Sequence, residues 1–158
     1  MKTIVRLVRL RDWKDIKQYL YNQSSEEKIK KNLVDDIKRI KLQKILRIVV
    51  EADGKVVGSC RFRKLSSPIK QHIVEINGMV VNENFQGQGL SSKMMEYGFL
   101  WAKKQKMEIA VLSVREGTKA EKIYKHMGFK VYGKLNGGIR EPWENKKTYN
   151  EIFLYKMI

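Results

Sequence analysis

The stretch from Val80 to Ser91 constrains the fold of this chain more than any other. An apolar run ending at Val81 meets a glycine-rich turn at residues 86–89, and a segment with helical spacing follows at once. A strand that passes through such a turn into a helix directs several backbone N–H groups, and the positive end of the helix dipole, at one place. The sequence therefore predicts a site for a phosphate group at the start of this helix.

The turn does not fit the common nucleotide-binding loops. No Gly-Lys-Ser/Thr closes it, as in a Walker A loop, and it lacks the third glycine of a dinucleotide fingerprint. The strands before it form a meander rather than a βαβ unit. Taken alone, the turn leaves two interpretations open: a phosphate cradle, or glycines that serve only a positive φ at the entry to a helix.

Hydrophobic periodicity predicts the order β-α-α-β-β-β-α-β-α-β-β. Ser24 and Glu27 form a capping-box pattern before the second helix, and Asp53-Gly54 is typical of a two-residue hairpin turn. This order favours an α/β fold with one mixed sheet and helices on its faces, and the length favours a single domain over residues 1–158. Expected strands lie at 3–9, 45–52, 55–63, 71–81, 109–114, 129–135 and 149–157, helices at 11–22, 25–43, 89–106 and 118–127, and a loop at 136–147.

Composition limits the class of protein. The net charge is +16, but the sequence contains no tract of five or six like charges. This distribution favours lysines spread over solvated faces, and it makes a nucleic-acid partner the less favoured interpretation of the charge. No apolar run approaches the roughly 18 residues of a membrane span. Cys60 is the single cysteine and cannot form a disulfide within the chain, which favours a reducing compartment, so we expect a cytoplasmic protein. Its apolar surroundings in the sequence predict a small buried hydrophobic residue. His72 and His126 have no partners at metal-ligand spacing, and we expect no metal.

A second stretch, from Gly117 to Phe129, gives the turn its context. Ala120, Tyr124 and Gly128-Phe129 fall at the spacing Ala-x-x-x-Tyr-x-x-x-Gly-Phe, one helix and one strand beyond the turn. The pair of stretches resembles the GCN5-related N-acetyltransferase (GNAT) family, whose first motif is Gln/Arg-x-x-Gly-x-Gly/Ala after a strand ending in valine. The chain departs from the family pattern at two positions, with Ser91 in place of Gly/Ala and Gly117 in place of an asparagine.

The resemblance implies a GNAT-like fold and an acetyl-CoA-dependent N-acetyltransferase acting by direct attack of a primary amine. In the family the strand before the turn splays from its neighbour at a bulge, here expected at Gly78, and its free backbone pairs with the pantetheine arm. An amide of Val80 or Val81 would polarise the thioester carbonyl. The implied acetyl-CoA-binding residues are Met79, Val80, Val81, Gln86, Gly87, Gln88, Gly89, Leu90, Ser91 and Ser92.

Two residues are candidates for proton transfer. The resemblance implies that Tyr124 protonates the leaving thiolate, whereas its apolar neighbours alone would favour a core aromatic. Glu75 lies six residues before Val81, and strand alternation places it with Asn77 on one face. It is our candidate for the base that receives the proton of the amine, and a solvated or ion-paired carboxylate is the alternative.

The acceptor stays open at this stage. A small molecule or a peptide would supply the amine, and the protein would be a monomer or a homodimer. Trp143 either lines an amine pocket or anchors its loop on the core. Alternative functions are a catalytically silent acyl-CoA-binding module and a nucleic-acid-binding module of the same fold.

Overall fold

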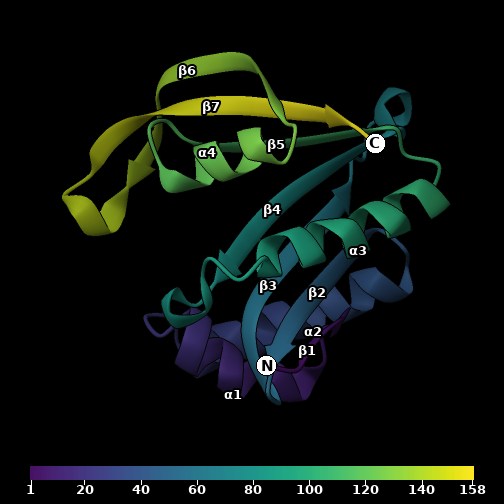
Figure 1. The fold of residues 1–158 in the computed structure, drawn as a ribbon, viewed down its shortest axis with the longest axis vertical. Coiled ribbons are helices and arrows are strands. Elements are labelled where there is room, and N and C mark those ends of the chain that lie inside the picture. Colours follow the sequence, from purple (N-terminus) through teal and green to yellow (C-terminus); the bar gives the residue numbers. More distant parts are fainter.

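The computed structural model describes residues 1–158 and contains one seven-stranded sheet (Figure 1). Its strands lie in the order β1-β2-β3-β4-β5-β7-β6, and only the β4–β5 pair is parallel. The mixed α/β fold and the predicted order of elements are confirmed. The strands are β1 (Thr3–Leu7), β2 (Ile45–Ala52), β3 (Lys55–Lys64), β4 (Ile73–Val81), β5 (Ile109–Arg115), β6 (Lys130–Glu141) and β7 (Lys147–Met157).

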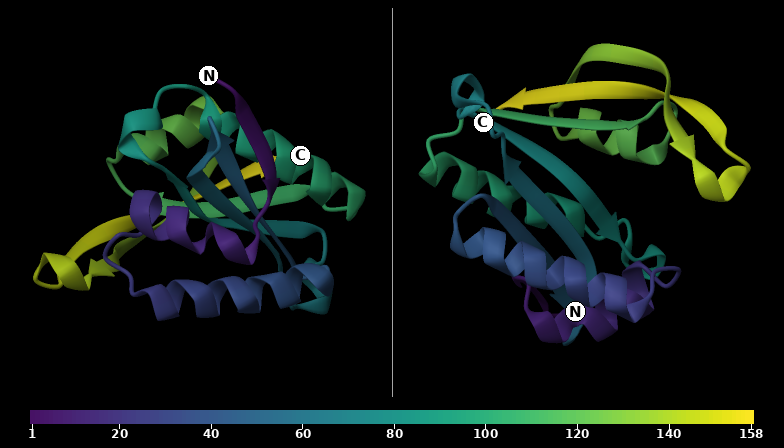
Figure 2. Two further views of the ribbon diagram at one scale, coloured as in Figure 1. Left: turned by 90° about the horizontal axis from the view of Figure 1, so that it is seen from below. Right: turned by 180° about the vertical axis from the view of Figure 1, so that it is seen from behind.

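Helices cover both faces of the sheet. The left view of Figure 2 shows α1 and α2 on one face and α3 and α4 on the other. Two predicted details are wrong: Ser25, and not Ser24, caps α2 by accepting a hydrogen bond from the Lys28 amide at 3.2 Å, and the segment 11–22 is a mixture of helical turns. The elements are a 3-10 turn (Leu10–Asp12), α1 (Trp13–Asp15), a π turn (Ile16–Leu20), α2 (Glu26–Lys41), α3 (Leu90–Lys104) and α4 (Lys119–His126).

The hydrophobic core has two parts, one on each face of the sheet. The larger part, with 20 buried residues, lies under α3 and includes Phe62, Met94 and Leu154. The smaller part, with six buried residues, lies under α1 and α2 and includes Leu33 and Val49. Because β2 and β3 are buried on both faces, they hold α2 and α3 in fixed positions relative to each other. None of the helices has both the length and the apolar character needed to cross a membrane.

Residues 136–147 do not form the loop that the glycine pair and Pro142 predict. Strand β6 continues to Glu141, and the turn to β7 is confined to residues 142–146. The register changes between Leu135 and Ile139, so the extra residues are accommodated as a bulge. Gly137 adopts a φ of +67° there, and its amide donates to Asn150 Oδ1 at 3.0 Å. Glycines are common both in loops and in bulges, so the sequence does not distinguish the two. Here the pairing of β6 with β7 makes these residues a bulge.

Candidate active site

A bulge in β4 marks the beginning of the site. Ser59 pairs with Val80 and Arg61 pairs with Asn77, so two residues, Gly78 and Met79, stand opposite Cys60 alone. Gly78 has a φ of +62°, a conformation that glycine adopts without the strain imposed by a side chain. The bulge lies at the residue that the sequence indicated.

Beyond Glu75, β4 has no neighbour on its β5 side. The parallel pairing of β4 with β5 extends only from Ile73 to Glu75, opposite residues 109–111. Strand β5 continues to Arg115 against β7, while β4 continues to Val81 against β3 alone. Figure 1 shows the two strands diverging from this point. The far half of β4 therefore presents an unpaired strand edge, which can accept an extended ligand as an additional strand does.

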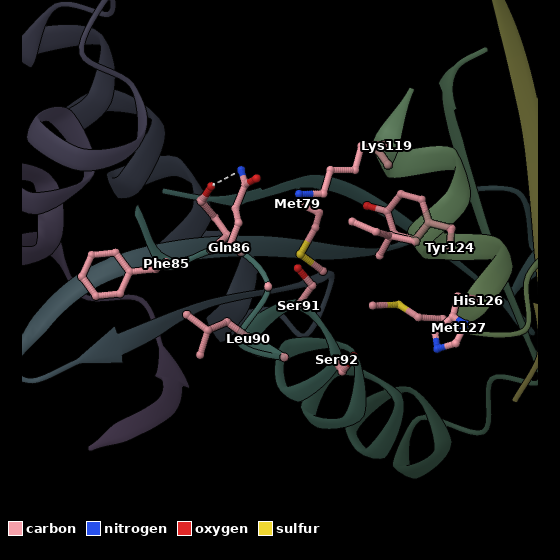
Figure 3. A pocket seen from close by; sticks show the side chains of 15 residues that line it. Met79, Phe85, Gln86, Leu90, Ser91, Ser92, Lys119, Tyr124, His126 and Met127 are labelled. Carbon is pink, nitrogen blue, oxygen red and sulfur yellow. Dashed lines mark hydrogen bonds between the residues drawn. The ribbon is translucent and has the colours of Figure 1, made fainter. Parts of the chain in front are cut away.

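The glycine-rich turn connects the end of β4 to α3. Gly87 and Gly89 both have positive φ, +76° and +73°, and Gly89 is the N-cap of α3. The Gln86 side chain folds back and donates from Nε2 to the Val81 carbonyl at 3.1 Å, which fixes the turn against the strand (Figure 3). The backbone N–H groups of residues 87–92 donate to no acceptor within the chain. This row of free donors, at the positive end of a 15-residue helix, suits an anionic ligand.

A cavity of about 600 Å³ opens in front of these donors. On one side it is bounded by the end of β4 and the start of α3, and on the other by α4 (Figure 3). It is lined by Met79, Val81, Phe85, Gln86, Gly87, Gly89, Leu90, Ser91, Ser92, Lys119, Ala120, Ile123, Tyr124, His126 and Met127. Of the predicted cofactor-binding residues, only Val80 and Gln88 have no part in this lining. The side chain of Val80 points to the other face of its strand, away from Met79 and Val81.

Tyr124 lies across the cavity from β4. Its residue surface is 7% exposed, and its ring packs edge-on against Phe129 with the ring centroids 5.8 Å apart. Figure 3 shows its hydroxyl directed toward Met79. Burial raises the pKa of this hydroxyl above its ordinary value of 10.0, and the nearby Cys60 adds to the effect. Tyr124 is therefore both a core aromatic and a protonated donor at the cavity wall, so the two interpretations of this residue are compatible.

Glu75 lies away from this cavity. Its Oε1 accepts from Arg63 Nη2 at 2.8 Å and from Asn77 Nδ2 at 3.3 Å, and its side chain is 33% exposed. Val74 and Ile76 contribute to the core under α3, so Glu75 and Asn77 point toward the α2 face of the sheet. The structure thus brings Tyr124 and the turn together and leaves Glu75 on the opposite face, at the point where β4 loses its β5 partner.

Two cationic or titratable side chains at the cavity were not foreseen. Lys119, at the start of α4, reaches over the cavity, and His126 lies at its rim (Figure 3). Both belong to α4, which the sequence predicted. Lys119 lies five residues before Tyr124 and His126 two residues after it, so placing them at the cavity required knowing which face of α4 borders it.

The glycine at position 117 has a structural role of its own. Its φ is +77°, and its amide donates to Glu121 Oε2 at 2.7 Å. Thr118, the N-cap of α4, accepts in turn from the Glu121 amide at 3.4 Å. The turn that leads into α4 is thus closed by reciprocal hydrogen bonds without the asparagine side chain of the family pattern.

Two other predicted residues have clear environments. Cys60 is 1% exposed, and burial raises the pKa of its thiol to about 12, so it is the buried hydrophobe that the sequence indicated. Trp143 is 78% exposed at the tip of the β6–β7 hairpin. The interpretation of Trp143 as an anchor packed on the core is therefore wrong.

Sequence comparison identifies a family and one curated relative. The Acetyltransferase (GNAT) family matches residues 10–129. An uncharacterized N-acetyltransferase of Methanocaldococcus jannaschii is 30% identical over 95 residues. That match covers 58% of this chain and 42% of the relative, so the chain aligns with less than half of that protein's length.

Solved structures share the fold over nearly the whole chain. A GNAT acetyltransferase of Streptococcus pneumoniae superimposes with a TM-score of 0.81 at 17% identity, covering 99% of this chain and 100% of the other. Ribosomal-protein-alanine N-acetyltransferase of Brucella melitensis gives 0.81 at 16% identity, with 98% and 99% covered. The yncA protein of Salmonella typhimurium, solved with acetyl-CoA, gives 0.80 at 16% identity, with 99% and 94% covered.

Proposed function

Because this chain belongs to the GNAT family of acetyltransferases, we propose that it is an acetyl-CoA-dependent N-acetyltransferase that moves an acetyl group to a primary amine of its acceptor. The observation that carries the proposal is the row of free backbone donors at residues 87–92, which faces the same cavity as Tyr124. A phosphate-binding turn and a protonated acid at one cavity match the two ends of an acyl-CoA thioester.

The residues present fit the pyrophosphate of acetyl-CoA. The turn supplies free amides and a helix dipole, and both attract a phosphate anion. Ser91 is small enough to keep the backbone close to the ligand. Lys119 adds a positive charge at the cavity, which a phosphate group would neutralise. A structural neighbour binds acetyl-CoA, which agrees with this assignment.

The unpaired edge of β4 suits the pantetheine arm. This arm is extended and carries amide groups, so it can pair with the free backbone of β4 between the bulge and Val81. Met79 and Val81 line the cavity at this level and would contact the apolar part of the arm. An amide of Val80 or Val81 is then available to polarise the thioester carbonyl.

Tyr124 is the acid in this proposal. Acetyl-CoA supplies the activated acetyl group, and a bond forms between the amine nitrogen and the acetyl carbon as the carbon–sulfur bond breaks. The Tyr124 hydroxyl donates its proton to the departing sulfur. Its raised pKa keeps the hydroxyl protonated before transfer, and the same burial excludes water from the leaving group.

The amine must lose a proton, and Glu75 is the proposed acceptor of that proton. Its position on the α2 face, beside the unpaired edge of β4, separates it from Tyr124 and from the cofactor cavity. A base and an acid on opposite sides of β4 would act on opposite sides of the thioester carbon. Glu75 would have to release Arg63 at least in part, or act through a water molecule.

The test is a calorimetric titration with CoA, followed by a thiol-release assay with acetyl-CoA and a panel of primary amines. We expect saturable CoA binding and amine-dependent release of free thiol. A protein that does not bind CoA would overturn the proposal. Binding with no thiol release on a broad amine panel would instead identify a catalytically silent acyl-CoA-binding module.

A further inference from the structure

A second cavity, of about 280 Å³, lies on the opposite face of the sheet from the candidate active site. It is enclosed by the π turn that follows α1, by the start of α2, and by the inner strands β2 and β3. Its polar lining consists of Tyr21, Ser24, Lys28, Asn32, Arg47 and Arg61. Three of these six side chains are cationic and none is acidic.

The two arginines share one carboxylate. Arg47 Nη1 donates to Asp36 Oδ2 at 2.8 Å, and Arg61 Nη2 donates to the same oxygen. Asp36 and Arg47 are 4% and 7% exposed, so this ion pair is buried. With Lys28 at the rim, three positive charges meet a single negative charge. Arg61 is 32% exposed and Lys28 lies at the exposed rim, so the excess positive charge faces the opening of the cavity, where an anion would neutralise it.

Several donors at the cavity have no acceptor within the chain. Arg61 Nε is buried and unpaired, the single such side-chain atom in residues 1–158. Arg47 uses only Nη1 in the hydrogen bonds of the structure. Burial raises the pKa of the Tyr21 hydroxyl, which also lines the cavity, and the charges of Arg47 and Arg61 act in the opposite direction. A cavity with free cationic donors, one of them a buried and unpaired nitrogen, is suited to an anion.

We propose that this cavity binds a carboxylate or phosphate group, and that in the transfer reaction this group belongs to the acceptor. The planar guanidinium groups of Arg47 and Arg61 match the paired oxygens of either anion. The second half of the inference rests on the proposed function: the acceptor is then an amine that also carries an acidic group. A volume of about 280 Å³ admits a small anionic group with the adjoining part of its molecule.

The position of Arg61 connects this cavity to the reaction. Arg61 pairs with Asn77, immediately before the bulge of β4, and Cys60 beside it faces the core that contains Tyr124. Arg61 points to the other face, where Glu75 also lies. The cavity therefore lies one strand away from β4, and an acceptor held at Arg61 by its acidic group would extend across β4 to reach its unpaired edge. Glu75, on the same face, is the candidate base on that path.

The binding half is tested without acetyl-CoA. Inorganic phosphate and succinate are titrated separately at constant ionic strength against the wild type, Arg61→Gln, Lys28→Gln and the control Lys38→Gln. Lys38 is an exposed lysine of the same helix that does not line the cavity, so its loss makes the same charge change elsewhere. We expect the dissociation constant for at least one anion to rise about tenfold or more in Arg61→Gln and Lys28→Gln only.

Phosphate can also bind at residues 87–92, and the comparison of variants separates the two sites. Arg61→Gln and Lys28→Gln leave that turn intact, so only binding lost in these two variants reports on the second cavity. Equal affinity in all four proteins for both anions would overturn the inference. Lys28 lies at the exposed rim, so Lys28→Gln keeps the test decisive even if Arg61→Gln folds poorly.

The acceptor half uses matched pairs of amines in the thiol-release assay. Each amino acid is compared with its amide, and an amino alkyl phosphate with the corresponding amino alcohol. We expect kcat/KM to favour the anionic member by about tenfold or more, and Arg61→Gln to remove the preference. The preferred member of each pair shows whether the acidic group of the acceptor is a carboxylate or a phosphate. If neutral and anionic amines are acetylated equally well, the inference about the acceptor is overturned and the proposed acetyltransferase function stands. If the anions bind but no amine is acetylated, the anion site stands and the proposed acetyltransferase function is overturned.

Discussion

Gly98 in α3 lies directly on the ring of Phe62 in β3. A Cβ atom built on Gly98 would fall 1.9 Å from Phe62 Cζ and 2.2 Å from Cε1, well inside any real carbon–carbon contact. The glycine therefore sets how closely α3 approaches the sheet. Because the glycine-rich turn at residues 86–89 leads directly into the same helix, this contact also fixes the height of the turn above β4.

Gly98→Ala should destabilise the protein by about 1–3 kcal/mol through overpacking, even though alanine is the better helix former. Urea unfolding followed by circular dichroism measures the change. Phe62→Leu removes the ring, so the double variant should regain part of the loss relative to the sum of the two single changes. A Gly98→Ala variant as stable as the wild type would show that α3 shifts freely on the sheet.

Gly89→Ala should weaken CoA binding by about tenfold, because a side chain disfavours the φ of +73° that directs the amides of the turn. Gly54→Ala is the matched control: its φ is +83°, it also has open space around it, and it lies in the β2–β3 turn and does not line the cavity. Both variants should lose roughly 1–2 kcal/mol of stability. Calorimetry should detect weaker CoA binding only for Gly89→Ala; equal affinities would remove the turn from the cofactor site.

The sequence was sufficient for features that depend on neighbouring residues. Helical spacing and turn residues predicted every strand and helix in order, because periodicity is set locally by which face each element buries. The turn at residues 86–89 is recognised from its own glycines, and the bulge at Gly78 is what the family resemblance implied. The two stretches that line the larger cavity, around Gly89 and Tyr124, follow from short motifs whose separation corresponds to one helix and one strand.

Features that depend on partners distant in the chain were missed. The bulge in β6 at residues 135–139 is selected by the register of β7, and Gly137 gives no indication of that register. The pair of arginines at Asp36 joins α2, β2 and β3, so neither its geometry nor its unpaired donors could be read from spacing. The ion pair of Glu75 with Arg63 has the same origin: it is set by the β3–β4 register.

The stability of the protein should fall above pH 9 in a way that depends on Cys60. Burial raises the pKa of this thiol from 9.0 to about 12, so above pH 9.0 the unfolded chain releases a proton that the folded chain retains. The stability contributed by Cys60 is therefore complete below pH 9.0 and decreases toward pH 12, by at most about 1.4 kcal/mol per pH unit. Unfolding free energies of the wild type and Cys60→Ala at a series of pH values give the difference in slope, and parallel curves would contradict the prediction.

Glu75→Gln should lower the rate of acetyl transfer most strongly at low pH, where few amines are already neutral and a base is needed. CoA affinity should not change, because Glu75 does not line the cavity proposed for CoA. Glu26→Gln is the control: it removes another ion-paired carboxylate, bonded to Lys30 on the surface of α2. An identical pH–rate profile for Glu75→Gln and the wild type would exclude Glu75 as the base.

Tyr124→Phe should lower kcat by about 100-fold or more, the usual contribution of a general acid, while CoA affinity stays within about twofold. The ring and its contact with Phe129 remain, and the hydroxyl forms no hydrogen bond within the chain, so unfolding stability should change by less than about 0.5 kcal/mol. Because burial keeps the pKa of Tyr124 above 10.0, any decline of the wild-type rate below that pH must come from another group and should persist in the variant. Pre-steady-state thiol release separates the chemical step from product release. A variant with wild-type chemistry would leave Tyr124 as a wall of the cavity, and the leaving sulfur would then take its proton from water.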